Sequence, residues 1–232
     1  MLAALRREVA AVWKVRDLAL SPPVLAQLGG APRQAHRVVG IGSSTGGPAA
    51  LMQLFASYPE PPECSFVVAQ HMPKGFTRGF AERLDRMTRL SAREAEPGCE
   101  LENGTILLAP GGSHLEFEAR GSRVLTRVVT ATDSDKYAPS VNRMFKSAAK
   151  HFGADLLGVI LTGMGDDGRE GALAIKQAGG NVIAESEETA VIFGMPQQAI
   201  RAGSVDAVLP LPEIAPVIQT GFAQTERTEG SS

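Results

Sequence analysis

Hydrophobic and polar residues follow two alternating patterns along the chain from residue 37 onward. Short apolar runs rich in β-branched residues, such as residues 38–41, have the length and composition of buried strands. Between these runs, apolar residues recur at helical spacing: Phe76, Phe80 and Leu84 lie four positions apart within residues 75–86. That spacing places them on one face of an amphipathic helix. The chain is therefore expected to alternate strands and helices.

The same two patterns predict the remaining elements. Strands are predicted over residues 38–41, 65–69, 105–109, 156–161, 182–185 and 207–209. Helices are predicted over residues 48–58, 75–86, 140–152 and 169–178, and residues 115–119 and 123–129 flank a glycine turn as a β-hairpin. Strands joined by helices of roughly 10–15 residues form βαβ units. The predicted fold class is therefore α/β: a doubly wound, mostly parallel sheet with helices on both faces and an antiparallel hairpin excursion.

The two ends of the chain differ from this central region. Residues 2–16 predict an amphipathic helix, and the Gly- and Pro-rich segment 21–32 that follows is typical of a linker. Residues 1–36 are thus expected to form an N-terminal helix and linker, either as a tether or as a brace packed on the domain. Residues 37–220 form the expected main domain, and residues 221–232, which end in small polar residues, a flexible C-terminal tail.

Composition and charge exclude several classes of protein. The formal net charge of −2 provides no basic field, so no nucleic-acid partner is expected. No apolar run approaches the roughly 18 residues of a membrane-spanning helix, so no membrane insertion is expected. Arg6, Arg7 and Glu8 interrupt the apolar N-terminus before a secretory signal can form. Cys64 and Cys99 are too few for a disulfide scaffold and form no CxxC pair, which favours a cytoplasmic location.

A candidate nucleophile lies in the turn between the first predicted strand and helix. Residues 42–46 (GSSTG) match the G-x-S-x-G motif, with Ser44 at its centre. In this context the serine hydroxyl projects from the carboxyl edge of the sheet, and the following helix N-terminus offers free N–H groups for an oxyanion. The alternatives are an ordinary Gly/Ser turn and a dinucleotide-binding loop. No acidic residue follows the second strand to bind a ribose, which argues against the latter.

A histidine and a pair of aspartates follow two other predicted strands. His71 comes directly after the second strand, and Asp166 and Asp167 follow the strand at residues 156–161. Because the carboxyl ends of parallel strands share one edge, His71 is a candidate base for Ser44, and one aspartate is a candidate to orient it. The alternatives are a structural histidine and aspartates that cap a helix. Sequence spacing does not choose between Asp166 and Asp167.

Six segments in a fixed order carry a resemblance to a known family. They are residues 41–47 (IGSSTGG), 70–77 (QHMPKGFT), 106–114 (ILLAPGGSH), 139–141 (PSV), 161–168 (LTGMGDDG) and 193–196 (FGMP). Together they closely resemble the catalytic domain of the chemotaxis protein-glutamate methylesterase, CheB. The resemblance extends over roughly residues 37–220, and several ordered motifs are more specific than any single one.

This resemblance implies roles for particular residues. Ser44 would be the nucleophile, His71 the base and Asp167 the orienting carboxylate, because the family's catalytic aspartate directly precedes the final glycine of its motif. Thr45 and Met164 are implied to line the oxyanion and substrate site. The implied reaction is hydrolysis of glutamate methyl esters on methyl-accepting chemoreceptors, with deamidation of glutamine as a second activity. The resemblance implies neither a cofactor nor a metal.

The resemblance leaves the extent of the protein and the client open. Family members carry an N-terminal phospho-receiver domain, for which this chain has no room. The chain is therefore expected to be either a fragment or a stand-alone esterase. Residues 1–36 resemble the last helix of the receiver domain and the linker that follows it. Lys74 and Arg78 are candidates to steer an acidic receptor helix, or are ordinary solvated charges. The alternative functions are an esterase for another methylated signalling protein or a small-molecule ester, and a non-catalytic binding module.

Overall fold

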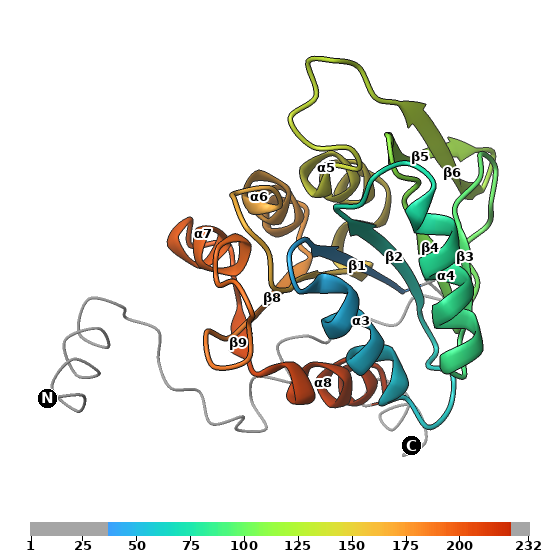
Figure 1. Ribbon diagram of the computed structural model, residues 1–232. Coiled ribbons are helices and arrows are strands. Elements are labelled where there is room, and N and C mark those ends of the chain that lie inside the picture. The colour runs from blue at the N-terminus through green and yellow to red at the C-terminus, as the bar shows by residue number, and fades with distance from the viewer. Residues whose placement is uncertain (1–36, 224–232) are drawn as a thin grey trace, which may run out of the picture.

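A parallel sheet of seven strands forms the centre of the fold (Figure 1). The computed structural model describes residues 37–223. The strands follow the order β3-β4-β2-β1-β7-β8-β9 across the sheet, and every neighbouring pair is parallel. Their bounds are β1 (Val38–Ser43), β2 (Ser65–Gln70), β3 (Ser91–Glu94), β4 (Thr105–Leu108), β7 (Leu156–Ile160), β8 (Asn181–Glu185) and β9 (Ala207–Leu209). A separate antiparallel pair consists of β5 (Ser113–Arg120) and β6 (Arg123–Thr130).

Helices cover both faces of the sheet. One apolar core lies between the sheet and α3 (Gly47–Ala56), α4 (Phe76–Met87) and α8 (Leu211–Ala223). A second core lies on the opposite face, under α5 (Val141–Phe152), α6 (Arg169–Gln177), α7 (Met195–Arg201) and the hairpin β5–β6. A short 3₁₀ turn, η1 (Gly153–Asp155), leads from α5 into β7. The predicted fold class, a doubly wound α/β sheet with an antiparallel hairpin, is therefore confirmed.

The central strands are largely apolar because both of their faces are covered. Val39 and Ile41 of β1 pack in the first core, whereas Val38 packs in the second. All six residues of β1 and all six of β2 are buried. A strand with two buried faces shows a continuous apolar run rather than an alternating pattern, which is why these strands are recognisable from sequence.

The order of the strands determines where a site can form. From β1 the chain moves to β2 on one side, and it returns to β1's other side only much later, with β7. The segment that follows β1 leads to β2, and the segment that follows β7 leads to β8 on the other side. These two segments therefore run in opposite directions from the carboxyl end of β1. Open α/β sheets bind ligands in the crevice at such a switch point.

Besides the short turn η1, three elements of residues 37–223 were not predicted from sequence. β3 is a four-residue edge strand with only Ala92 buried fully, so its polar composition hides it. α7 has only seven residues and begins in a Gly–Met–Pro segment. α8 contains Pro216 in its interior, which normally argues against a helix. Burial of Leu211, Ile214 and Ile218 in the first core outweighs that penalty.

Helix α8 reaches into the segment expected as a C-terminal tail. α8 continues to Ala223, so residues 221–223 of the expected tail are helical. The rest of that tail and the expected N-terminal helix and linker over residues 1–36 lie outside the described residues. Within residues 37–223, no helix has the length and apolar character needed to cross a membrane.

We expect the close approach of β1 to α5 to make Gly42 intolerant of a side chain. A Cβ atom there would lie under 3.0 Å from both methyl carbons of Val141. Overpacking of this kind typically costs about 1–3 kcal/mol, so Gly42→Ala should lower the free energy of unfolding in urea by that order. Gly79→Ala in α4 is the control, because a Cβ there meets open space and removes the entropic penalty of a helical glycine. Equal stability of the Gly42→Ala protein and the parent would contradict the packing argument.

Candidate active site

The carboxyl ends of β1 and β2 bring Ser44 and His71 to neighbouring positions. Ser43 and Gln70 are partners in the parallel register, so the next residue of each strand leaves the sheet at the same level. The His71 N–H donates to the Ser43 carbonyl at 3.0 Å, and the Ser44 N–H donates to the Thr162 carbonyl beyond β7 at 3.0 Å. Main-chain hydrogen bonds therefore tie three segments together at one edge of the sheet.

Glycines allow neighbouring segments of the main chain to approach Ser44 closely. Gly46 has φ +84° and turns the chain from β1 into α3. A Cβ at Gly163 would lie 2.8 Å from the Cβ of Ser44, and a side chain at Gly47 would collide with Gln70. The sharp turn expected from the G-x-S-x-G motif is thus present, and it leaves Ser44 partly exposed at the N-terminus of α3.

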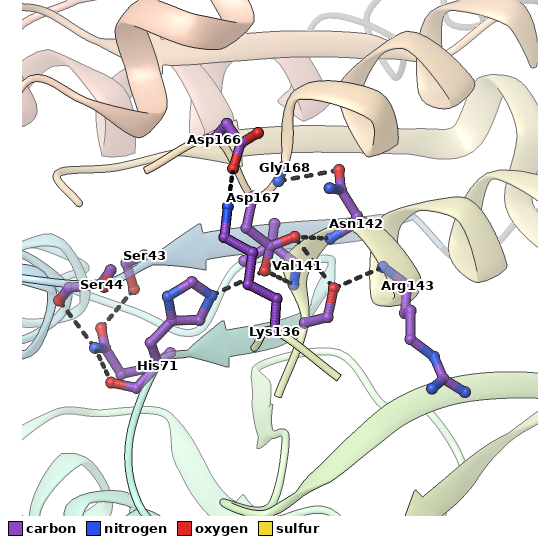
Figure 2. A network of polar contacts seen from close by, with 12 residues as sticks. Ser43, Ser44, His71, Lys136, Val141, Asn142, Arg143, Asp166, Asp167 and Gly168 are labelled. Carbon is purple, nitrogen blue, oxygen red and sulfur yellow. Dashed lines mark hydrogen bonds and ion pairs between the residues drawn. The ribbon is translucent and has the colours of Figure 1, made fainter. Parts of the chain in front are cut away.

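Gln70 holds the ends of β1 and β2 in place. The Ser43 hydroxyl donates to its Oε1 at 2.7 Å. Its Nε2 donates to the Ser44 carbonyl at 2.9 Å and to the His71 carbonyl at 3.0 Å (Figure 2). Sequence reasoning missed this residue. The signal was a polar side chain at the last position of an otherwise apolar strand, because a buried amide must find partners.

Asp167 is a buried carboxylate that accepts four hydrogen bonds. Its Oδ2 accepts from His71 Nε2 at 2.9 Å and from the Val141 N–H at 2.7 Å. Its Oδ1 accepts from the Asn142 N–H at 2.9 Å and from the Ser140 hydroxyl at 3.1 Å (Figure 2). Three of these donors belong to the first turn of α5 and its N-cap, where free N–H groups and the helix dipole favour negative charge.

The ionisation of Asp167 determines the tautomer of His71. Burial alone would raise the pKa of Asp167, but the hydrogen bonds from His71 and from the N–H groups of Asn142 and Val141 outweigh burial and lower that pKa. An ionised carboxylate can only accept, so the proton of their shared hydrogen bond belongs to Nε2 of His71. In the neutral ring Nδ1 is then a proton acceptor, and Figure 2 shows it directed to the side of the site on which Ser44 lies.

Asp166 has a different environment from Asp167. Its Oδ1 accepts from Lys136 Nζ at 3.0 Å, and its side chain is 46% exposed, against 1% for Asp167. The residues alone left the choice between the two aspartates open. In the structure it is Asp167 that faces His71, while Asp166 points toward a neighbouring loop.

The chain is similar to known proteins in both sequence and structure. A family model described as CheB methylesterase matches residues 39–218. A protein-glutamate methylesterase/protein-glutamine glutaminase of Geobacter sulfurreducens is 51% identical over 183 residues, which cover 78% of this chain and 49% of that protein. Another of Moorella thermoacetica is 44% identical over 216 residues, covering 92% and 51%. The CheB methylesterase catalytic domain of Thermotoga maritima matches with a TM-score of 0.76 and 39% identity, over 82% of this chain and 99% of that domain.

The chain belongs to the CheB methylesterase family. It spans about half the length of the curated relatives it matches. The resemblance found from six sequence segments is thereby confirmed.

In this CheB-family domain, Thr45 follows Ser44 in the chain, and Met164 follows Gly163, where a Cβ would lie close to Ser44. Thr45 is exposed in the turn before α3, and Met164, 65% exposed, follows the glycine that packs against Ser44. Among the hydrogen bonds of residues 37–223, none is donated by the main-chain N–H of either residue. Two unused N–H groups beside a serine are the kind of donors that stabilise an oxyanion.

Thr162 is a further residue that sequence reasoning missed. Its hydroxyl donates to the Thr45 carbonyl at 2.9 Å and accepts from the Ile192 N–H at 2.9 Å. Its N–H donates to Oε2 of Glu185 at 2.7 Å, and Glu185 is fully buried at the end of β8. Thr162 therefore links the turn at Ser44 to the loop after β8 and to a buried carboxyl group.

Glu185 has a raised pKa. Burial raises it, and hydrogen bonds from the Thr162 N–H and the Thr189 hydroxyl only partly offset that effect. A carboxyl group whose pKa is higher in the folded than in the unfolded chain binds more protons when folded. Stability is then lost as pH rises from the ordinary glutamate pKa, about 4.3, through the folded value.

We expect Glu185→Gln to remove the loss of stability that the buried Glu185 causes as the pH rises. Glutamine keeps an acceptor for the Thr162 N–H and can donate to Thr189, but it carries no charge to desolvate. The difference in melting temperature, variant minus parent, should increase between pH 4 and pH 8. Glu187→Gln, at an exposed neighbouring position, is the control and should show no such trend. A difference that stays constant across this range would rule out the buried charge as the cause.

Proposed function

We propose that residues 37–220 form the catalytic unit of a serine hydrolase that removes methyl groups from glutamate methyl esters on methyl-accepting chemoreceptors. The observation that carries the proposal is the His71–Asp167 hydrogen bond at the N-terminus of α5, with Ser44 and His71 each following one of the register partners Ser43 and Gln70. The relatives' names, protein-glutamate methylesterase/protein-glutamine glutaminase, supply the substrate class. Free thiols at Cys64 and Cys99 are in keeping with a cytoplasmic setting.

Ser44 attacks the ester carbonyl, and Nδ1 of His71 accepts its proton. Asp167 holds the imidazole in the required tautomer and stabilises the imidazolium that forms. The new bond joins Ser44 Oγ to the glutamyl carbon, and the negative charge on the carbonyl oxygen is met by the N–H groups of Thr45 and Met164. His71 then returns the proton to the departing methoxide, so methanol leaves and a glutamyl-serine ester remains.

Water completes the reaction by the same route. His71 accepts a proton from water, which attacks the glutamyl-serine ester, and the proton then goes to Ser44 as the free glutamate leaves. Attack on a glutamine side chain follows the same path with ammonia as the leaving group, which would account for a glutaminase activity. Neither sequence of steps calls for a redox group.

The two basic side chains considered for steering differ in their surroundings. Lys74 is exposed without a charged partner among residues 37–223. Arg78 lies 3.7 Å from Glu94 Oε2, so part of its charge is offset. We propose Lys74 as the stronger contributor to attraction of an acidic receptor helix, an effect that acts on the association rate and weakens with salt.

We expect Ser44→Ala and His71→Ala each to abolish methanol release from methylated receptor membranes, because each removes a group that makes or breaks a bond. Both proteins should keep the parent's circular dichroism spectrum and melting temperature within a few degrees, which shows that the fold is intact. Near-normal turnover by the Ser44→Ala protein would remove the nucleophile from the proposal. Release from a simple ester but never from receptor would instead point to a small-molecule esterase.

The two aspartates provide a matched pair of variants. Asp167→Asn should lower kcat by about four orders of magnitude, because an amide can donate to Nε2 and so stabilises the wrong tautomer of His71. Asp166→Asn changes the same functional group one residue away but loses only an exposed ion pair with Lys136, so its kcat should fall far less. Steady-state methanol release measures both, and the reverse ranking would assign the orienting role to Asp166.

A further inference from the structure

An aromatic ring lies flat against His71. The centroids of the Tyr137 and His71 rings are 4.6 Å apart, and the ring planes differ by 10°. Tyr137 belongs to the connection between β6 and α5, far in sequence from the three residues of the proposed mechanism. No motif pointed to it, because a tyrosine in a polar loop has no periodic or spacing signal.

Tyr137 also lies close to Gly165 and Lys136. Gly165 in the loop that carries Asp167 has φ +96°, and a Cβ there would lie 2.5 Å from the Tyr137 hydroxyl. Lys136 Nζ lies 4.9 Å from the centroid of the Tyr137 ring. It also donates to Asp166 Oδ1 at 3.0 Å (Figure 2). The Lys136–Asp166 ion pair thereby joins the loop before α5 to the loop after β7.

The base of the same loop is also held. Asp135 Oδ2 accepts from the N–H of Thr132 at 2.8 Å and from its hydroxyl at 2.9 Å, and Arg143 Nη1 donates to Asp135 Oδ1 at 3.5 Å. His114 is fully buried beneath the loop, with Nε2 3.4 Å from Asp135 Oδ2 and Nδ1 accepting from the Ser140 N–H at 3.2 Å. Contacts of residues before Tyr137 in the chain, at Asp135, and after it, at Ser140, thus hold the loop that carries it.

The proposed mechanism requires both nitrogens of the His71 ring to be oriented at the same time. Nε2 has to face Asp167 while Nδ1 faces Ser44, and rotation of the ring about its bond to Cβ breaks both alignments together. A hydrogen bond to one nitrogen leaves the tilt of the ring free, whereas a parallel ring against its face restricts that tilt and keeps water off that face. Parallel aromatic stacking is also attractive for the imidazolium formed during the reaction.

We propose that Tyr137 is a positioning residue for His71, and that its stacked ring fixes the imidazole plane needed for proton transfer from Ser44. This inference rests on the proposed function. It predicts that the rate of Ser44 acylation depends on an aromatic ring at position 137 and not on the tyrosine hydroxyl. Substrate binding should be affected little, because the contact is with the base.

The test compares Tyr137→Leu with Tyr137→Phe, which keeps the ring and removes only the hydroxyl. The readouts are the rate at which a fluorophosphonate probe labels Ser44, kcat and KM for methanol release, and the melting temperature. Tyr137→Leu should lower the labelling rate and kcat together by on the order of 10–100-fold, the range expected for a misaligned catalytic group, with KM and the melting temperature near those of the parent. Tyr137→Phe should stay within about two-fold of the parent, because stacking does not need the hydroxyl.

Each other outcome overturns the inference. A Tyr137→Leu protein that is labelled at the parent's rate shows that stacking is dispensable. Equal losses in the leucine and phenylalanine variants assign the role to the hydroxyl, and a rate loss matched by a large fall in melting temperature assigns Tyr137 to folding. Probe labelling does not require a receptor, so it tests the inference even if the protein substrate is not a chemoreceptor. Labelling that persists in the Ser44→Ala protein would instead contradict the proposed function itself.

Discussion

The arrangement of the site depends on one interaction, the placement of the Asp167 carboxylate at the N-terminus of α5. A buried carboxylate is costly unless its charge is met by donors, and here main-chain N–H groups and the N-cap hydroxyl of Ser140 supply them. Against the effect of burial, the hydrogen bond from His71 and those from the N–H groups of Asn142 and Val141 lower the pKa of Asp167, and its ionised form assigns the shared proton to Nε2 of His71. In the proposed mechanism the helix therefore acts on His71 through Asp167.

A second constraint is the crowding of chain ends where β1, β2 and β7 leave the sheet. Only glycine fits at several of these positions, because neighbouring backbone or side-chain atoms occupy the space of a Cβ. Gln70 and Thr162 then supply the hydrogen bonds that hold the crowded segments in register. Glycine makes the close approach possible, and buried polar side chains keep it specific, since an unsatisfied polar group at this depth would destabilise the fold.

The sequence predicted most of the elements because the burial that forms them leaves a local pattern. Strands covered on both faces produce continuous apolar runs, and α4 and α5 carry helical periodicity. The pattern failed where local signals oppose the tertiary context. Pro216 argued against a helix at α8, which packing in the core stabilises. The polar composition of β3 argued against a strand there, although β3 pairs with β4 at the edge of the sheet.

What the sequence determined by itself was the fold class, the family resemblance and the candidate chemistry of Ser44, His71 and the aspartate pair, because each resides in residue type, spacing and position after a strand. What only the tertiary structure decided was which partners those groups meet. The hydrogen bonds of Gln70 and Thr162 and the stacked ring of Tyr137 join segments distant in the chain. The choice of Asp167 was implied by the family resemblance, and its contact with His71 is shown by the structure. Such contacts depend on how loops close over the sheet, and no local pattern of residues encodes that geometry.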